Sequence, residues 1–188
     1  SWRARLGDQL GAYVVEPLRS RAGLLADPLA LAGLNSVCAM LSLYLPDREA
    51  QPGLYAQTQA FLAQMEGVPV AQWAPAYLRW EMLLLEEIGF GLDLSRCAVT
   101  GHRDDLAFVS PKTGRAVSRT GAGDWASRLL PLPQGLLGQG PMSRDELAAG
   151  LAITGHFLAR ASAMLGRQSL PEARGRLLDL LMRHLPPA

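Results

Sequence analysis

The feature that most constrains this chain is an amphipathic helical pattern that stops at a glycine pair and runs directly into a polar loop, all between Leu78 and Ser118. Leucine, methionine and isoleucine recur at helical spacing as far as Ile88, and Glu81, Glu86 and Glu87 are predicted to mark the solvent face. Gly89 and Gly91 then supply a helix stop. We therefore expect a helix with one buried face, followed by a small β-hairpin.

The composition favours packed helices around one core. The chain has 188 residues, enough for one sizeable core without staples. Hydrophobic residues make up 49% of it, but aromatic residues only 6%, so leucine and alanine must supply most of the core.

Local start and stop signals divide the chain into about five helices. Asp27 and Pro28 are typical of a helix start, and two Ser-x-x-Glu capping boxes begin at Ser143 and Ser169. The helices are expected at residues 28–44, 52–66, 75–88, 143–165 and 170–185. Residues 93–124 are predicted to insert a hairpin with strands at 106–109 and 115–117, residues 128–140 an irregular crossing, and residues 1–16 an extended segment with a strand at 12–15.

The cysteines and the apolar segments indicate a cytoplasmic protein without membrane contact. Cys38 and Cys97 cannot form a disulfide framework, and Cys38 lies in an apolar helical run where a small hydrophobic residue is expected. The longest apolar segment, residues 29–45, contains Asn35 and two serines, which makes it short and polar for a membrane-spanning helix. No N-terminal stretch has the pattern of an export signal.

Charge is distributed unevenly along the chain. Residues 1–93 carry 6 arginines against 10 acidic residues, a net charge of −4, whereas residues 94–188 carry 12 cations against 7 acidic residues, a net charge of +5. Lys112 is the only lysine, so guanidinium groups would make any phosphate contacts. The arginine excess has a second interpretation, a coding bias without functional meaning.

The motifs of residues 78–114, taken in order, resemble the C-terminal part of the bacterial RecO family of recombination mediators. The resemblance rests on a helix that ends in a Gly-aromatic-Gly-Leu-Asp-Leu run, then a cysteine and a Phe-x-Ser-Pro turn, and is weaker over residues 29–46 and 151–185. The matching residues are Leu78, Arg79, Glu81, Leu84, Leu85, Gly89, Phe90, Gly91, Leu92, Asp93, Leu94, Cys97, Gly101, Phe108, Ser110, Pro111 and Gly114.

The family carries a four-cysteine zinc knuckle at this point, and the chain departs from it. Cys97 matches one knuckle position, while Thr100, Ser118 and Gly121 stand at the other three. A zinc site needs four thiolate or imidazole ligands, and His102 is the only other soft donor nearby. We therefore expect a degenerate knuckle that binds no metal, held by hydrophobic contacts and backbone hydrogen bonds.

The resemblance implies a mainly α-helical fold with remnant β structure at the N-terminus. Residues 1–16 would be the end of an oligonucleotide-binding (OB) barrel, most of which would precede Ser1. Residues 17–188 would form the helical domain, with the hairpin insertion at 93–124.

The function implied by the resemblance is that of a nucleoid-associated mediator that needs no cofactor. It would bind and anneal single- and double-stranded DNA and, with RecR, load RecA onto DNA coated by single-stranded DNA-binding protein. A basic strip would contact phosphates without reading sequence; the alternative is an ordinary solvated face. The candidate residues are Arg103, Lys112, Arg115, Arg119, Arg160, Arg167, Arg174, Arg176 and Arg183.

A second candidate site is a partner-peptide pocket around Arg79. Trp73, Tyr77 and Trp80 beside this arginine could hold the acidic, hydrophobic tail of the single-stranded DNA-binding protein, or could simply anchor a helix in the core. A competing function is a protein-interaction scaffold that recruits RecR or that tail but does not bind DNA.

An enzyme is the least supported of the three classes of function. Cys97, His102 and Asp104 stand close in one loop, but nearness in sequence does not define a triad, and no phosphate loop, nucleophile elbow or metalloprotease helix is present. His156 and His184 are predicted to be ordinary residues of amphipathic helices.

Overall fold

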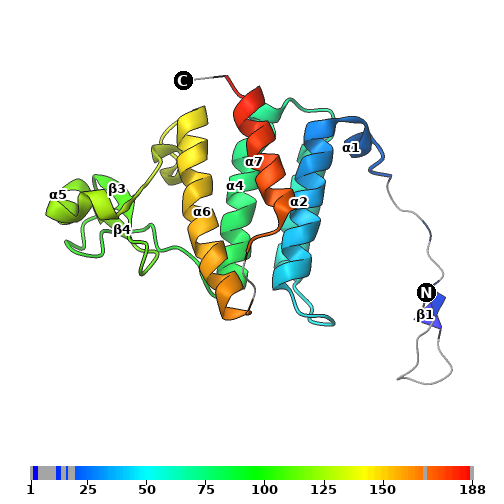
Figure 1. Cartoon of the computed structure of the whole chain (residues 1–188), viewed down its shortest axis with the longest axis horizontal. Helices are drawn as coiled ribbons and strands as arrows, with labels where there is room; N and C mark the ends of the chain where they lie inside the picture. Colours follow the sequence, from blue (N-terminus) through cyan, green and yellow to red (C-terminus); the bar gives the residue numbers. More distant parts are fainter. Residues whose placement is uncertain (1, 4–11, 14–15, 17–19, 167–168, 187–188) are drawn as a thin grey trace.

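A computed structural model describes residues 2–3, 12–13, 16, 20–166 and 169–186. Helices α2 (Pro28–Tyr44), α4 (Val70–Glu87), α6 (Arg144–Met164) and α7 (Glu172–His184) lie side by side in a bundle (Figure 1). A small sheet projects beyond α6, on the side away from the N-terminus. The predicted mainly helical fold with an inserted β unit is confirmed.

The remaining helices are short or lie against the bundle. Helix α1 (Gly23–Ala26) leads into α2, and α3 (Pro52–Gln64) packs against α4. Asp27 caps α2 by accepting a hydrogen bond from the Leu29 amide, and Pro28 occupies the first turn as predicted. Helix α5 (Arg119–Ala122) and the 3-10 helix η1 (Gly123–Arg128) lie in the projecting unit, and a second 3-10 helix, η2 (Gln134–Leu137), lies against α6.

Two helix starts differ from the prediction, and both involve proline. Helix α4 begins at Val70 and contains Pro75, because Trp73 and Ala74 are fully buried and packing outweighs one missing hydrogen bond near the helix start. Helix α7 begins at Glu172 without a side-chain cap, so the box at Ser169 does not form. The proline at 171 disfavours helical backbone at the residue before it, which moves the start. The box at Ser143 is present.

The inserted β unit is a three-stranded antiparallel sheet, so the predicted hairpin was incomplete. Strand β3 (Leu106–Val109) pairs with β4 (Ala116–Ser118) on one side and with β5 (Leu130–Pro131) on the other. Strand β5 lies in the segment predicted to be irregular. Its proline is tolerated because β5 is an edge strand. Two short strands, β1 (Trp2–Arg3) and β2 (Ala12–Tyr13), pair near the N-terminus; most of the predicted barrel remnant lies outside the described residues.

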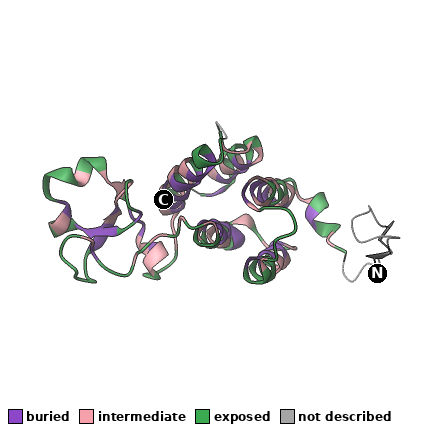
Figure 2. Ribbon diagram, turned by 90° about the horizontal axis from the view of Figure 1, so that it is seen from below, coloured by how far each residue is buried: buried purple, intermediate pink, exposed green. Residues whose placement is uncertain are grey.

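Aromatic rings from α3 and α4 fill the centre of the bundle. Figure 2 shows the buried residues on the facing sides of the helices. Phe61 contacts Trp73, Tyr77 and Trp80, with ring centroids 6.0–6.4 Å apart. Trp80 donates to the Thr58 hydroxyl at 2.9 Å, and the Tyr77 and Ser36 hydroxyls lie 2.7 Å apart. The thiol of Cys38, expected in the core, is exposed instead.

Candidate functional site

The four knuckle positions converge around the sulfur of Cys97, which is 1% exposed. The Ser118 amide and hydroxyl donate to Sγ at 3.2 and 3.3 Å, and the Thr100 amide donates at 3.4 Å. A Cβ atom at Gly121 would lie 2.9 Å from Sγ, so the sulfur occupies the space that a side chain there would need. Hydrogen bonds to the sulfur thus join three of the four knuckle positions, and the missing side chain at Gly121 leaves room for it.

The residues around Cys97 do not fit a zinc ion. Ser118 directs its hydroxyl at the sulfur, Thr100 contributes a backbone amide, and Gly121 has no side chain that could bind a metal. In the part of the chain that the structure describes, no three His, Cys, Asp or Glu side chains are grouped to hold a metal. The absence of zinc remains a prediction for the protein in solution.

The environment of Cys97 favours its thiolate. Burial raises the pKa of the thiol, but the hydrogen bonds from Ser118 and Thr100 together lower it by more, and the pKa falls from 9.0 to about 6. The side chain of His102 is exposed, and the sulfur's donors come from Ser118 and Thr100. The Cys97, His102 and Asp104 alternative therefore gains no geometric support.

Three of the candidate DNA-binding cations lie in the β3–β4 hairpin or on the part of α6 that bonds to its turn. The Arg160 guanidinium donates to the carbonyl oxygens of Pro111 and Lys112 at 2.9 and 3.0 Å. The His156 Nε2 atom lies 2.9 Å from the Pro111 oxygen. This places Lys112 beside Arg160, and Arg115 follows in the same hairpin, 3.6 Å from the Asp93 carboxylate. We call Lys112, Arg115 and Arg160 the turn cations.

The other candidate cations lie elsewhere, so the nine do not form one strip. Arg119 is paired with Asp105 at 3.3 Å, and Arg103 is exposed in the loop just before Asp105. Arg176 pairs with Glu172 one turn earlier on α7, and Arg183 is exposed near the end of that helix. Arg167 lies outside the described residues.

Arg174 is a core residue, not a surface cation. It makes a two-point ion pair with Glu81, Nε to Oε1 at 2.7 Å and Nη2 to Oε2 at 3.0 Å, and also donates to the Leu151 carbonyl. The side chains of Arg174 and Glu81 are 7% and 0% exposed. The assignment of Glu81 to the solvent face is thus also corrected, because Thr154 and Arg174 satisfy its carboxylate inside the bundle.

Burial also separates the predicted peptide-binding residues. Trp73 and Tyr77 are 0% exposed and Trp80 is 2% exposed, so these rings pack in the core and cannot line a surface pocket. Arg79 is exposed on the opposite side of α4. Of the four residues, only Arg79 lies beside a groove.

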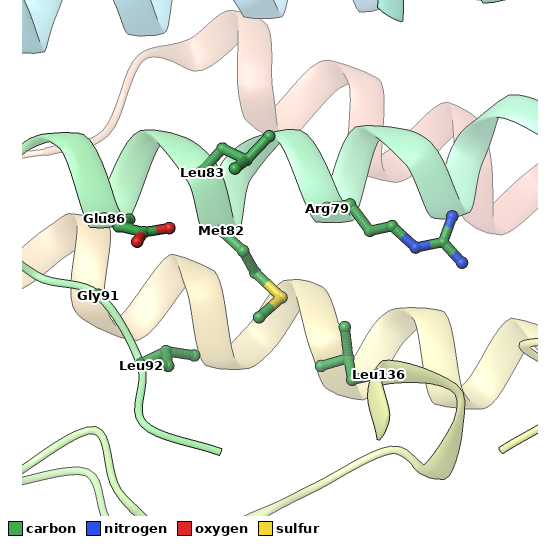
Figure 3. Close-up of a pocket in the computed structure, with 7 residues that line it drawn as sticks. All are labelled: Arg79, Met82, Leu83, Glu86, Gly91, Leu92 and Leu136. Atoms are coloured by element: carbon green, nitrogen blue, oxygen red, sulfur yellow. The ribbon is translucent and has the colours of Figure 1, made fainter. Parts of the chain in front are cut away.

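That groove has a volume of about 460 Å³ and runs along α4 (Figure 3). Arg79 and Glu86 lie toward its two ends, with Met82 between them. The remaining lining residues are Leu83, Gly91, Leu92 and Leu136. Sequence reasoning missed these. The one sequence signal for the groove was Leu83, a leucine at a solvent-facing helical position, and this residue is 37% exposed in the structure.

Comparison with known proteins assigns the chain to a family. Residues 25–171 match the family model described as Recombination protein O C terminal. The chain is 62% identical over 183 residues to a DNA repair protein RecO of Cereibacter sphaeroides (strain ATCC 17025), which covers 97% of this chain and 76% of that protein. The chain belongs to the RecO family.

Other RecO proteins agree with this assignment. The identity is 56% to the DNA repair protein RecO of Jannaschia sp. (strain CCS1), with 98% of this chain and 75% of that protein covered. It is 51% to that of Roseobacter denitrificans, with 98% and 77% covered. No solved structure matches the chain. RecO relatives of this similarity support a role in DNA repair.

No helix in the described ranges is both long and apolar enough to cross a bilayer.

Proposed function

We propose that this RecO family member is a recombination mediator. It binds and anneals single- and double-stranded DNA in the bacterial cytoplasm, in association with the nucleoid. Together with RecR it helps to load RecA onto DNA coated by single-stranded DNA-binding protein, whose C-terminal tail it holds. No cofactor and no catalytic residue take part, because annealing requires only that cations reduce the repulsion between strands while base edges stay free.

The observation that carries the DNA-binding part is the cluster of turn cations. Lys112 and Arg115 lie in the β3–β4 hairpin, and Arg160 of α6 donates hydrogen bonds to the carbonyl oxygens of its turn, so the backbone that carries these cations is fixed to α6. One nearby acid, Asp93, pairs with Arg115. Such a cluster supports phosphate contacts that do not depend on sequence.

The DNA-binding part is tested by the salt dependence of single-strand binding. Replacing Lys112 and Arg115 together with glutamine removes two charges and leaves Arg160 to hold the turn. The slope of log affinity against log salt should decrease by about 0.7 for each phosphate that the variant no longer neutralises. Fluorescence anisotropy with a labelled oligonucleotide at several salt concentrations measures it.

The matched control is the double replacement of Arg176 and Arg183 with glutamine, on the exposed face of α7. Its slope should equal that of the unmodified protein. If the slope instead changes in the α7 variant and not in the hairpin variant, the turn cations are not the DNA-binding surface.

The groove beside Arg79 supports the partner-binding part. Its apolar wall fits hydrophobic side chains, and Arg79 at one end can accept a terminal carboxylate in a charge-assisted hydrogen bond. Glu86 toward the other end repels acidic groups there, which orients a tail with its carboxylate at Arg79. The same geometry favours the second candidate function, a scaffold that holds protein partners without binding DNA.

Replacing Arg79 with alanine should weaken binding of an acidic, hydrophobic tail peptide by about 1.5–3 kcal/mol, tenfold or more in Kd. Calorimetry measures the affinity. A peptide with an amidated C-terminus should bind the original protein and the variant equally weakly, whereas Glu86→Gln should bind the acid form at least as tightly as the original. Equal affinity of Arg79→Ala and the original protein for the acid peptide would remove Arg79 from the site.

A further inference from the structure

Trp125 is a large aromatic residue that the fold leaves outside the core. It lies in η1, between α5 and β5 in the projecting unit, and is 63% exposed. The other two tryptophans whose side chains are described, Trp73 and Trp80, are buried. A tryptophan in water forgoes a large hydrophobic contribution to folding, and its ring face is available to contact a ligand.

The indole of Trp125 contacts the guanidinium of a neighbouring arginine. The Arg128 guanidinium carbon lies 4.9 Å from the ring centroid, a cation–π contact three residues further along the 3-10 helix. Within the described ranges no carboxylate is within ion-pair distance of Arg128. An exposed aromatic ring therefore stands next to a cation that no carboxylate in the described ranges pairs with.

The surroundings of Trp125 distinguish a base from a protein partner as its occupant. A protein-binding hot spot usually places a tryptophan within a desolvated apolar patch. Here Asp124, Ser127 and Arg128 of the same helix are polar and exposed, while the apolar neighbour Ala126 is half-buried and packs against the core. A single aromatic face with a neighbouring guanidinium is instead the combination that binds single-stranded nucleic acid, where the ring stacks on a base and the cation contacts a phosphate.

We propose that Trp125 and Arg128 form a stacking site for an unpaired nucleobase of single-stranded DNA. The base stacks on the exposed part of the indole, and Arg128 contacts the adjoining phosphate. This site rests on the proposed DNA-binding function and adds to it a contact that is specific for single strands, because a base inside a duplex is not available to stack.

The test uses three variants of the chain and three ligands. Trp125→Phe keeps a stacking ring but removes the indole fluorescence, Trp125→Ala removes both, and Arg128→Gln removes the charge. The ligands are oligothymidylate, an abasic oligonucleotide of equal length and a DNA duplex. Trp125→Ala should lose about tenfold in affinity for oligothymidylate and little for the other two ligands. Oligothymidylate should quench the original protein more than Trp125→Phe, and this difference isolates Trp125 from the other tryptophans.

The outcomes separate this site from the function on which it rests. If the original protein binds oligothymidylate and Trp125→Ala binds it equally well, the stacking site is refuted and DNA binding stands. Equal reductions in affinity for the abasic and normal oligonucleotides would also refute it, because the contribution would then not depend on a base. If the original protein binds none of the ligands, DNA binding and the stacking site both fail. Circular dichroism of Trp125→Ala confirms that the variant is folded.

Discussion

At the residue scale, the ion pair between Glu81 and Arg174 is buried, so removing one partner should cost more than breaking an exposed pair. It joins α4 to α7, and the Thr154 hydroxyl of α6 also donates to Glu81, so one carboxylate connects three helices. Gly155 makes room for the guanidinium, because a Cβ atom there would lie 3.0 Å from Nη1. Burial raises the pKa of Tyr44, close to this pair, to about 12, which keeps that hydroxyl neutral.

Replacing Arg174 with methionine should destabilise the fold by about 3–5 kcal/mol, because Glu81 would remain buried without a counter-charge. Adding Glu81→Leu should recover much of that loss, since no unpaired charge is then left. Urea denaturation measures both variants. Arg176→Met is the control on the same helix, and its exposed pair should be worth less than about 1 kcal/mol. A small loss in the Arg174 single variant would contradict this role.

The Cys97 thiolate predicts a pH dependence of stability. The unfolded thiol keeps its proton up to about pH 9, whereas the folded thiol loses it above about pH 6. The unfolded state therefore binds more protons in this window, so the free energy of unfolding should rise from pH 6 to pH 9. The contribution of the Cys97 thiolate is lost as the pH falls through 6. Cys97→Ala should show a smaller rise in urea denaturation, and Cys38→Ala, which removes an exposed thiol, should show the same rise as the original protein.

The hydrogen bonds to the Cys97 sulfur also predict that the protein binds no zinc. Protein purified without chelator should contain no stoichiometric zinc by elemental analysis, and a chelator should leave its Tm unchanged. Zinc at one equivalent would show that the loop recruits other ligands, with His102 the first to replace.

At the element scale, the crossing of α4 and α6 depends on a glycine. A Cβ atom at Gly150 of α6 would overlap the Leu78 Cδ2 atom of α4. Gly150→Ala should therefore cost about 1–3 kcal/mol through overpacking, despite the better helix propensity of alanine. Gly175→Ala in α7 is the matched change, because nothing lies within 4 Å of that position. It should stabilise the protein by about 0.5–1 kcal/mol.

Thermal or urea denaturation of the two glycine variants compares the cost of overpacking at Gly150 with the gain in helix propensity at Gly175. If Gly150→Ala were as stable as Gly175→Ala, the two helices would not be held at the separation that the structure shows.

At the scale of the whole molecule, the projecting sheet is attached to the bundle through α6. Arg160 and His156 contact the carbonyl oxygens of the β3–β4 turn, and the Arg160 guanidinium also lies 5.7 Å from the Phe157 ring centroid. Replacing Arg160 with leucine removes the charged donor but keeps an apolar side chain. Hydrogen exchange should then become faster in residues 106–118 and stay unchanged in α2.

Arg183→Leu is the control for this exchange experiment, because its side chain is exposed and bonds within α7. Unchanged exchange in residues 106–118 of Arg160→Leu would mean that other contacts fix the sheet. The control and the α2 amides together show whether any change is local to the turn.

The sequence alone determined that five long helices form, where three of them begin, and the family resemblance. Apolar periodicity, the Asp27-Pro28 start and the Ser143 box are local features, so the ends of α2 and the start of α6 followed from neighbouring residues. The hairpin strands followed for the same reason, since the turn at 110–114 lies within a few residues of both. The knuckle positions could be named because their order along the chain is itself the motif.

Only the tertiary structure decided which polar and aromatic residues are buried. Glu81 and Arg174 look like surface charges in sequence, yet they are 93 residues apart and pair in the core. Trp73 and Trp80 are buried while Trp125 is exposed, although composition treats them alike. Burial and long-range pairing depend on how helices pack, and a periodic pattern specifies which face of a helix is apolar but not which distant side chain satisfies a charge on it.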